Sequence, residues 1–311
     1  MTKYLGPGLH DISAERYHGD PCERPSLSAS LAHLLLSATP RHAWWASGRL
    51  NPDYEPEEKA HFDVGSAFHE LMTGKGRGIE VIPFKDYKSK AAQERRDEAR
   101  AIGKVPLLTK QDVEVRRMVT AARWQMRQHG IGDPFEGGEN EVTLIWEQDG
   151  VMNRLMIDCL DRENRVAYDL KTCAGYAEPE GWVRTAMSHS VDVRAAHYLD
   201  GLSRVLGGHW RYRFVPIEKE APHCLSVLEL SEGALFMAQK KIERAREIWR
   251  HCLATNSWPA WSAEIAVVDP PAWHESKWLE RESREQDFKQ RTSQDVLAAS
   301  IRWQAPQGVT P

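Results

Sequence analysis

The sequence has little cysteine, and no two of its five cysteines form a C-x-x-C pair. Single, scattered cysteines of odd number argue against a disulfide framework, a structural zinc site and an iron–sulfur cluster. No apolar run approaches the length of a membrane span, and the first residues lack the apolar core of a secretory signal. We therefore expect a cytoplasmic protein that does not enter a membrane and keeps its cysteines reduced.

Two further motifs are missing from the chain. There is no G-x-S-x-G turn for a serine nucleophile and no G-x-x-x-x-G-K-[ST] loop for a nucleotide phosphate. The net charge of −4 gives no overall attraction to nucleic acid, so any DNA contact needs a local basic patch. These absences leave hydrolysis by serine and binding of nucleotides by a phosphate loop without support.

One local excess of positive charge is present. Between Lys85 and Arg127 there are twelve lysines and arginines against six acids, an excess of +6. The segment is compatible with solvated helices covered by ion pairs, and equally with a surface that neutralises DNA phosphates. In the second case Arg95 and Arg96, at its centre, are candidates for nucleic-acid binding.

The length of 311 residues and a hydrophobic content of 41% predict one large α/β domain with an appendage. Apolar spacing and turn residues predict helices at Ser26–Leu36, Phe62–Thr73, Val191–Val205 and Ala234–Ala254, and one or two more in the basic segment. Strands are expected between Val142 and Lys171, at Tyr212–Ile217 and at Cys224–Leu230. Near Pro270-Pro271 we place a boundary between a domain covering residues 1–268 and a Trp- and charge-rich tail, 269–311.

The most informative segment is a pair of short strands around Asp158 and around Asp169-Leu170-Lys171. Side chains alternate between the faces of a strand, so Asp169 and Lys171 share one face. If the intervening turn is centred on Glu163-Asn164, Asp158 lies directly opposite Asp169, with β-carbons about 4.5–5.5 Å apart. A turn with an odd number of residues would rotate Asp158 away.

Two facing carboxylates repel each other unless a proton, a cationic neighbour or a metal ion lies between them. Oxygen ligands without a cysteine pattern favour Mg²⁺ or Mn²⁺ over zinc. His69 and Glu141 are further candidate ligands, although a structural histidine and an exposed acid at the end of a strand are the ordinary explanations. A solvated hairpin, in which Lys171 is a surface counter-charge, remains the alternative at this point.

The order of features along the chain adds a resemblance to a known family. Ser28-Ala29-Ser30 begins a helix that ends near Thr39-Pro40, and Gly65-Ser66-Ala67-Phe68-His69 follows. Asp158 and Asp169-Leu170-Lys171-Thr172 come next, ten residues separating the two acids. This order resembles the PD-(D/E)XK nuclease superfamily, and within it the RecE-like phage and prophage recombination exonucleases.

The resemblance implies a restriction-endonuclease-like core, with a central mixed β-sheet flanked by helices, and roles for five residues. Asp158 and Asp169 would bind the catalytic Mg²⁺, for which Mn²⁺ could substitute, and the Leu170 carbonyl would add a ligand. Lys171 would position or activate the attacking water. His69 would lie at a second metal ion.

A DNA-binding role is implied for the helix that follows the strands. Family members often carry a glutamine four residues before a tyrosine there, and this chain has Arg194 before Tyr198. The resemblance implies digestion of linear duplex DNA from its 5′ end toward its 3′ end in recombination. It also implies a ring-shaped homo-oligomer and a single-strand annealing partner. The alternatives are a binding module that keeps the fold without the chemistry, and a nuclease for RNA or branched DNA.

Overall fold

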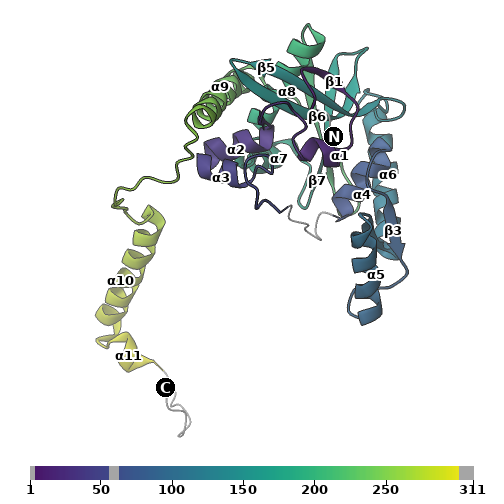
Figure 1. Cartoon of the computed structure of the whole chain (residues 1–311). Coiled ribbons are helices and arrows are strands. Elements are labelled where there is room, and N and C mark those ends of the chain that lie inside the picture. The colour runs from purple at the N-terminus through teal and green to yellow at the C-terminus, as the bar shows by residue number, and fades with distance from the viewer. Residues whose placement is uncertain (1–3, 56–62, 301–311) are drawn as a thin grey trace. The chain divides into compact units, whose positions relative to one another are not determined.

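A computed structural model describes residues 4–55 and 63–300 of the chain (Figure 1). The chain divides into two compact units, Met1–Ala260 and Trp261–Pro311. The expected boundary at 268/269 falls inside the second unit, and the assignment of a catalytic domain and a tail stays a prediction. Among the described residues, no helix is both long and apolar enough to cross a membrane.

The first unit is built on a mixed sheet of six strands, which confirms the predicted fold class. Its strands run in the order β1 (Gly8–His10), β5 (Glu139–Gln148), β6 (Val151–Asp161), β7 (Val166–Cys173) and β8 (Arg211–Glu218), and β2 (Ser26–Leu27) also pairs with β6. The pairs β1·β5, β5·β6 and β6·β7 are antiparallel, whereas β7·β8 and β2·β6 are parallel. The strands β5 to β7 therefore lie in the middle of the sheet.

One face of the sheet is covered by α4 (Asp63–Thr73) and α6 (Thr109–Gln128) (Figure 1). Phe68 and Met72 from α4 and Met118 from α6 pack on Tyr168 and Leu170 of β7, and all five are at least 94% buried. A small parallel sheet of β3 (Ile79–Ile82) and β4 (Val105–Leu108), with α5 (Lys90–Ala101), extends this side. Buried apolar packing thus fixes α4 against β7.

The other face is covered by α7 (Pro179–Ser188) and α8 (Val191–Leu206). Farther out lie α2 (Ala29–Ser37), α3 (Pro40–Trp45) and α9 (Glu232–Thr255). The apolar stripe of α9 is fully buried and consists of Ala238, Ile242, Ala245 and Trp249. The short α1 (Ala14–His18) precedes β2. Consequently α8 is held between the sheet and an outer helical layer, and its inward face lies beside β5 and β6.

Most of the expected elements are confirmed, with changes at their ends. The helix expected at Ser26–Leu36 begins at Ala29, because the Ser28 hydroxyl caps it by accepting from the Leu31 amide at 3.3 Å. The helix expected from Phe62 begins, within the described residues, at Asp63, and Phe62 itself lies outside them. The helix expected at Val191–Val205 extends to Leu206.

The strand predicted at Cys224–Leu230 is wrong. The segment forms only two isolated bridges to β8, Phe214 with Leu228 and Ile217 with Leu225. The Ser226 amide donates to the Pro216 carbonyl at 3.1 Å, but Pro216 has no amide hydrogen to return. A continuous ladder is therefore interrupted in its middle, as proline in a paired strand dictates.

The second unit contains α10 (Ala272–Thr292) and α11 (Val296–Ala299). Neither helix has a buried residue. Trp273 and Trp278 on α10 are 60% and 57% exposed, so the aromatic content of this segment does not form a core among the described residues.

Candidate active site

Three acids form a row across the three central strands. Asn140 pairs with Cys159 and Val142 with Ile157, so Glu141 on β5 and Asp158 on β6 occupy facing positions. Cys159 pairs with Tyr168 on β7 at the last position of that ladder, so Asp158 and Asp169 are the next residues on the two strands, and the Leu170 amide donates to the Asp158 carboxylate. The four residues between Asp161 and Val166 form the even-numbered turn that this alignment requires.

Asp158 is fixed by hydrogen bonds to both of its oxygens. The Leu170 amide donates to Oδ2 at 2.7 Å, and His69 Nε2 lies 3.2 Å from Oδ1. Burial alone would raise the pKa of this carboxyl, but the charges of His69 and Lys171 and the amide of Leu170 hold it well below its usual value. Asp158 is therefore an anion with a fixed orientation at neutral pH.

His69, on the neighbouring helix α4, lies between two of the acids, Glu141 and Asp158. It projects from α4 and places Nδ1 3.4 Å from Glu141 Oε1, while Nε2 faces Asp158. Burial works against the charged imidazole, yet the Asp158 and Glu141 carboxylates outweigh it and raise the pKa of His69. The packing of Phe68 and Met72 in the core determines where His69 projects.

Glu141 has an unusual backbone for a residue inside a strand. Its φ is +53°, a left-handed conformation that costs a side-chain-bearing residue free energy. Burial raises its pKa, His69 lowers it, and the Asp158 carboxylate adds to the increase. The sequence placed Glu141 before the first strand, whereas β5 begins at Glu139 and contains it. A strained backbone at a buried acid is typical of functional sites.

Asp169 is the most deeply buried acid of the row, with 3% of its side chain exposed. Lys171 Nζ lies 2.5 Å from its Oδ2 and donates to the Leu170 carbonyl at 3.1 Å. The Asp169 Oδ2 atom has no partner with the geometry of a hydrogen bond. The Lys171 ammonium, about a third exposed, thus connects the buried carboxylate with solvent.

Arg194 and Tyr198 reach the same place from α8. Arg194 Nη1 lies 3.8 Å from Asp169 Oδ1, and its guanidinium lies 5.8 Å from the centre of the Tyr198 ring. The Tyr198 hydroxyl donates to the Met156 carbonyl at 2.9 Å, and burial raises the Tyr198 pKa well above its usual value. Tyr198 is only 4% exposed, and the Arg194 guanidinium packs on its ring. The Arg194 side chain itself is about a third exposed.

The comparisons with known proteins bear on this arrangement. The profile of a family described as "PDDEXK-like domain of unknown function (DUF3799)" matches residues 37–271, about three quarters of the chain. The chain belongs to this family. The match contains α4, the three central strands and α8, which carry all of the residues described above. The predicted superfamily is thereby confirmed.

One solved structure shows the same fold, and a second is reported beside it. A candidate exonuclease from Eubacterium rectale aligns with a TM-score of 0.57 at 12% identity, covering 86% of this chain and 98% of its own. A phage-related exonuclease from Haemophilus somnus aligns with a TM-score of 0.33 at 8% identity, covering 75% and 96%. No curated protein matches the chain. The family and the fold together support a nuclease.

PDDEXK nucleases generally use divalent metals, and the donor set of this PDDEXK-like domain fits such an ion. Carboxylate and carbonyl oxygens from Asp158, Asp169 and Leu170 are hard ligands, and the buried Asp169 Oδ2 lacks a hydrogen bond. Among the described residues, no three His, Cys, Asp or Glu side chains already form a ligand cage. Instead, Lys171 and His69 supply the positive charge beside the carboxylates.

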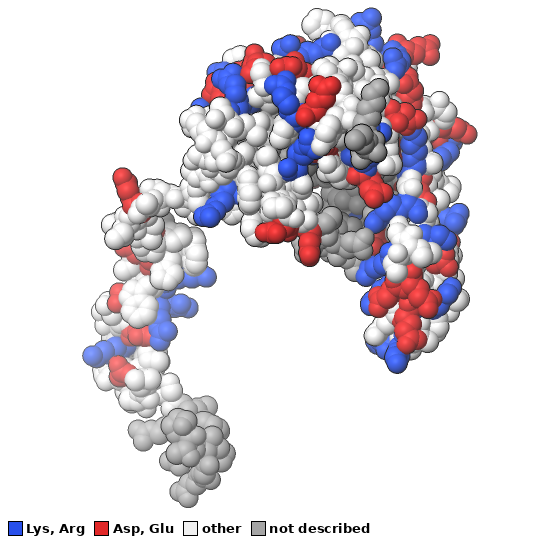
Figure 2. Space-filling model, viewed as in Figure 1, with Lys and Arg blue, Asp and Glu red and all other residues white. Residues whose placement is uncertain are grey.

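The basic segment of the domain is covered by ion pairs. Arg95 lies 3.2 Å from Glu98 and 3.5 Å from Glu80, and Arg96 lies 2.8 Å from Asp97. Figure 2 shows basic and acidic side chains interspersed over this side of the molecule. A role of Arg95 and Arg96 in DNA binding stays a prediction. To bind a DNA phosphate, each guanidinium would have to leave the carboxylate with which it is now paired.

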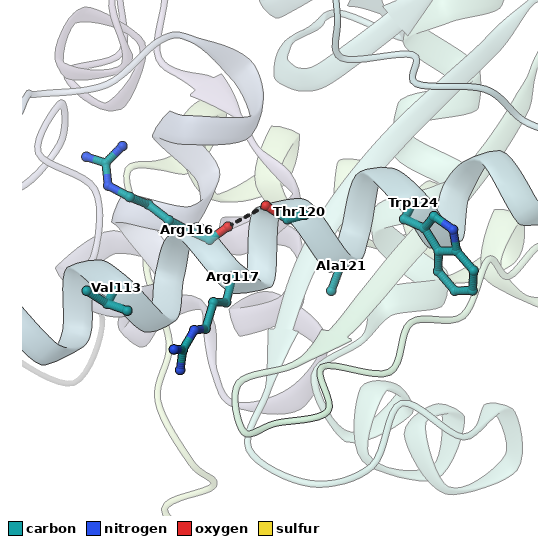
Figure 3. Close-up of a pocket in the computed structure, with 6 residues that line it drawn as sticks. All are labelled: Val113, Arg116, Arg117, Thr120, Ala121 and Trp124. Atoms are coloured by element: carbon teal, nitrogen blue, oxygen red, sulfur yellow. Dashed lines mark hydrogen bonds between the residues drawn. The ribbon is translucent and has the colours of Figure 1, made fainter.

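A shallow hollow on α6 is separate from the carboxylate row. It is lined by Val113, Arg116, Arg117, Thr120, Ala121 and Trp124, all from this one helix (Figure 3). The Thr120 hydroxyl donates to the Arg116 carbonyl at 3.0 Å, and both arginines pair with acids on the same helix. The hollow therefore contains no group that could act as a nucleophile or hold a metal.

A buried ionic cluster beside α8 could not be predicted from the sequence. Arg154 on β6 donates to the Ser26 hydroxyl at 2.7 Å and lies 3.2 Å from Asp20. Its carbonyl is bound by His197 Nε2 at 3.1 Å, which ties α8 to the strand that carries Asp158. Because more than a hundred residues separate Arg154 from Ser26, no local spacing could reveal the contact.

Proposed function

We propose that this PDDEXK-like domain is a metal-dependent deoxyribonuclease that hydrolyses phosphodiester bonds. The observation that supports it is the meeting of charged groups at one place, where the Leu170 amide donates to Asp158 and the Lys171 ammonium lies against Asp169. Isolated acids in a solvated hairpin would be exposed, whereas Asp169 is buried and held by charges from two elements. A buried acid with converging cations matches a site for a phosphate and its metal ion better than a surface hairpin.

The residues have distinct roles in this proposal. Asp158, Asp169 and the Leu170 carbonyl would hold Mg²⁺, which supplies an activated water and stabilises charge on the attacking and leaving oxygens. Lys171 places its positive charge beside the water and the scissile phosphate. His69 holds Asp158 and Glu141 in position, and it could bind a second ion only after losing its proton and releasing one of these two carboxylates.

We further propose the finer properties that the family resemblance implies. The substrate is the end of a linear duplex, digested from the 5′ end toward the 3′ end, and Arg194 contacts the DNA. Arg194 supports this role because its guanidinium is about a third exposed beside Asp169. The chain would work as a ring-shaped homo-oligomer with a single-strand annealing protein as partner.

The decisive experiment is degradation of linear duplex DNA by the purified full chain with and without Mg²⁺. We expect Mg²⁺-dependent loss of duplex, abolished in Asp169→Ala and in Lys171→Ala. Glu163→Gln is the matched control, because Glu163 is an exposed acid in the turn of the same hairpin. Equal activity in Asp169→Ala and the unsubstituted chain would refute the assignment.

Blocked and closed substrates test the finer claims. A duplex blocked at its 5′ ends and a closed circle should both resist digestion, whereas a duplex blocked at its 3′ ends should be degraded. Digestion of the circle would indicate an endonuclease. DNA binding without cleavage under any metal would favour the alternative, a module that keeps the fold for binding alone.

A further inference from the structure

The loop that follows β7 carries the most exposed tyrosine for which the structure gives an exposure. Tyr176 is 84% exposed and lies five residues after Lys171, between the end of β7 at Cys173 and the start of α7 at Pro179. Within residues 4–55 and 63–300, its side chain makes no hydrogen bond or ring contact. The reach of five residues keeps its Cα within about 18 Å of that of Lys171.

This exposure is imposed by the backbone on either side. The Ala177 amide donates to Glu218 Oε1 at 3.1 Å, and its carbonyl accepts from the Ser226 hydroxyl at 2.6 Å. Ala177 is 2% exposed, so the inward position next to the tyrosine is already filled. On the other side the Cys173 carbonyl accepts from the Lys219 amide at 3.0 Å. Tyr176 is thus presented outward by a loop that is tied down at both ends.

Glu218 is the residue that holds this loop. It is 92% buried at the end of β8, and its second carboxylate oxygen accepts from the Cys224 amide at 3.3 Å. Because both oxygens of the Glu218 carboxylate accept from backbone amides, this side chain has a structural role in fixing the loop. A Cβ built on Gly175 would meet nothing within 4 Å, so the segment before Tyr176 projects from the surface.

A lysine lies beside the start of the Tyr176 loop. Because β7 and β8 are parallel, their carboxyl ends lie at the same edge of the sheet, and Lys219 directly follows β8. Its amide is bonded to Cys173, which places Lys219 beside the first residues of the Tyr176 loop. Proteins hold single-stranded nucleic acid by stacking bases on exposed aromatic rings and by contacting phosphates with basic side chains, and this edge of the sheet carries one residue of each kind.

A single exposed aromatic residue is common on protein surfaces, and exposure alone would carry no conclusion. Tyr176 differs in its place, on a tied loop that leaves the strand of Asp169 and Lys171. We propose that Tyr176 and Lys219 form a stacking site for an unpaired nucleotide of the DNA strand that runs into the carboxylate row. This inference rests on the proposed function and deepens it, since it makes a frayed or single-stranded end the preferred substrate.

The test measures binding separately from cleavage. The full chain carrying Asp169→Ala, which should not degrade DNA, is titrated against duplexes with a blunt end or a short single-stranded end containing 2-aminopurine. Stacking on the tyrosine quenches 2-aminopurine, so we expect quenching by the chain with Tyr176. Adding Tyr176→Ala should remove the quenching and weaken binding of the single-stranded end about tenfold, the size expected for one stacked base.

Three further variants make the result specific. Tyr176→Phe retains the ring and should keep both affinity and quenching. Phe236→Ala removes a 62% exposed aromatic ring on α9 and should change neither. Lys219→Gln should weaken binding and lower the slope of log affinity against log salt by roughly 0.7–0.9, as for one lost phosphate contact.

The outcomes separate this inference from the nuclease assignment. Equal binding and quenching in Tyr176→Ala and Tyr176→Phe overturn the stacking site, even if the unsubstituted chain degrades DNA. Tyrosine-dependent quenching in a chain that never cleaves DNA overturns the nuclease and leaves the stacking site in place. Absence of any DNA binding overturns the inference directly.

Discussion

The backbone of Glu141 provides a test of whether this site contains stored strain. Glu141 has a φ of +53° inside β5, between residues that pair regularly with β6. Glycine adopts this conformation at no steric cost, and alanine does not. Replacing Glu141 by glycine and, separately, by alanine removes the same carboxylate, so the difference between the two variants reports on the backbone alone.

The expected difference follows from two opposing contributions. A left-handed backbone costs a residue with a β-carbon about 1–2 kcal/mol. Against this, a glycine loses more conformational entropy on folding than an alanine, which costs about 0.4–1 kcal/mol of stability. We therefore expect Glu141→Gly to be more stable than Glu141→Ala by roughly 0.5–1 kcal/mol. Both variants should lose the same nuclease activity, because each lacks the acid.

The assay is urea denaturation of the full chain, with midpoints compared at equal slope. Val142 is the control position, because it is the next residue of β5 and its φ is not positive. There the order should reverse, with Val142→Gly less stable than Val142→Ala by roughly 0.5–1 kcal/mol. If Glu141→Gly proves less stable than Glu141→Ala, the strain inferred from the backbone is not present in solution.

Two other predictions follow from the packing of α8. A Cβ at Gly201 would lie 2.7 Å from buried atoms of both Leu155 and Trp146, so Gly201→Ala should destabilise the chain by roughly 1–2 kcal/mol in thermal unfolding, despite alanine's better helix propensity. Burial, helped by Arg246, lowers the pKa of His197 from 6.5 to about 3, so the folded state favours the neutral ring and the unfolded state takes up the proton. Its stabilisation is complete above pH 6.5 and is lost as the pH falls toward 3, by about 2 kcal/mol between pH 8 and pH 5, and His197→Gln should remove that part of the pH dependence. An unchanged midpoint of thermal unfolding for Gly201→Ala, or the same pH profile with and without His197, would contradict these two expectations.

The hairpin shows why some of the site could be predicted from the sequence. Alternation of side chains and the length of one turn set the register between Asp158 and Asp169, and these depend on neighbours within about a dozen residues. The same locality explains why the helices over Val191–Leu206 and Glu232–Thr255 were anticipated, since each is encoded by apolar spacing along its own length. The strand predicted at Cys224–Leu230 is wrong for a different reason: its partner strand contains Pro216, which has no amide hydrogen for a continuous ladder.

The sequence by itself determined the fold class and the places of Asp158 on one strand and of Asp169 and Lys171 on the next, because strand periodicity and turn length act locally. Only the tertiary structure decided that His69 from α4 and Arg194 from α8 meet this row, and that Glu141 lies inside a strand with a left-handed backbone. The physical reason is that those contacts depend on how two helices pack against opposite faces of the sheet, and packing is set by the burial of many apolar side chains together rather than by any spacing within one segment.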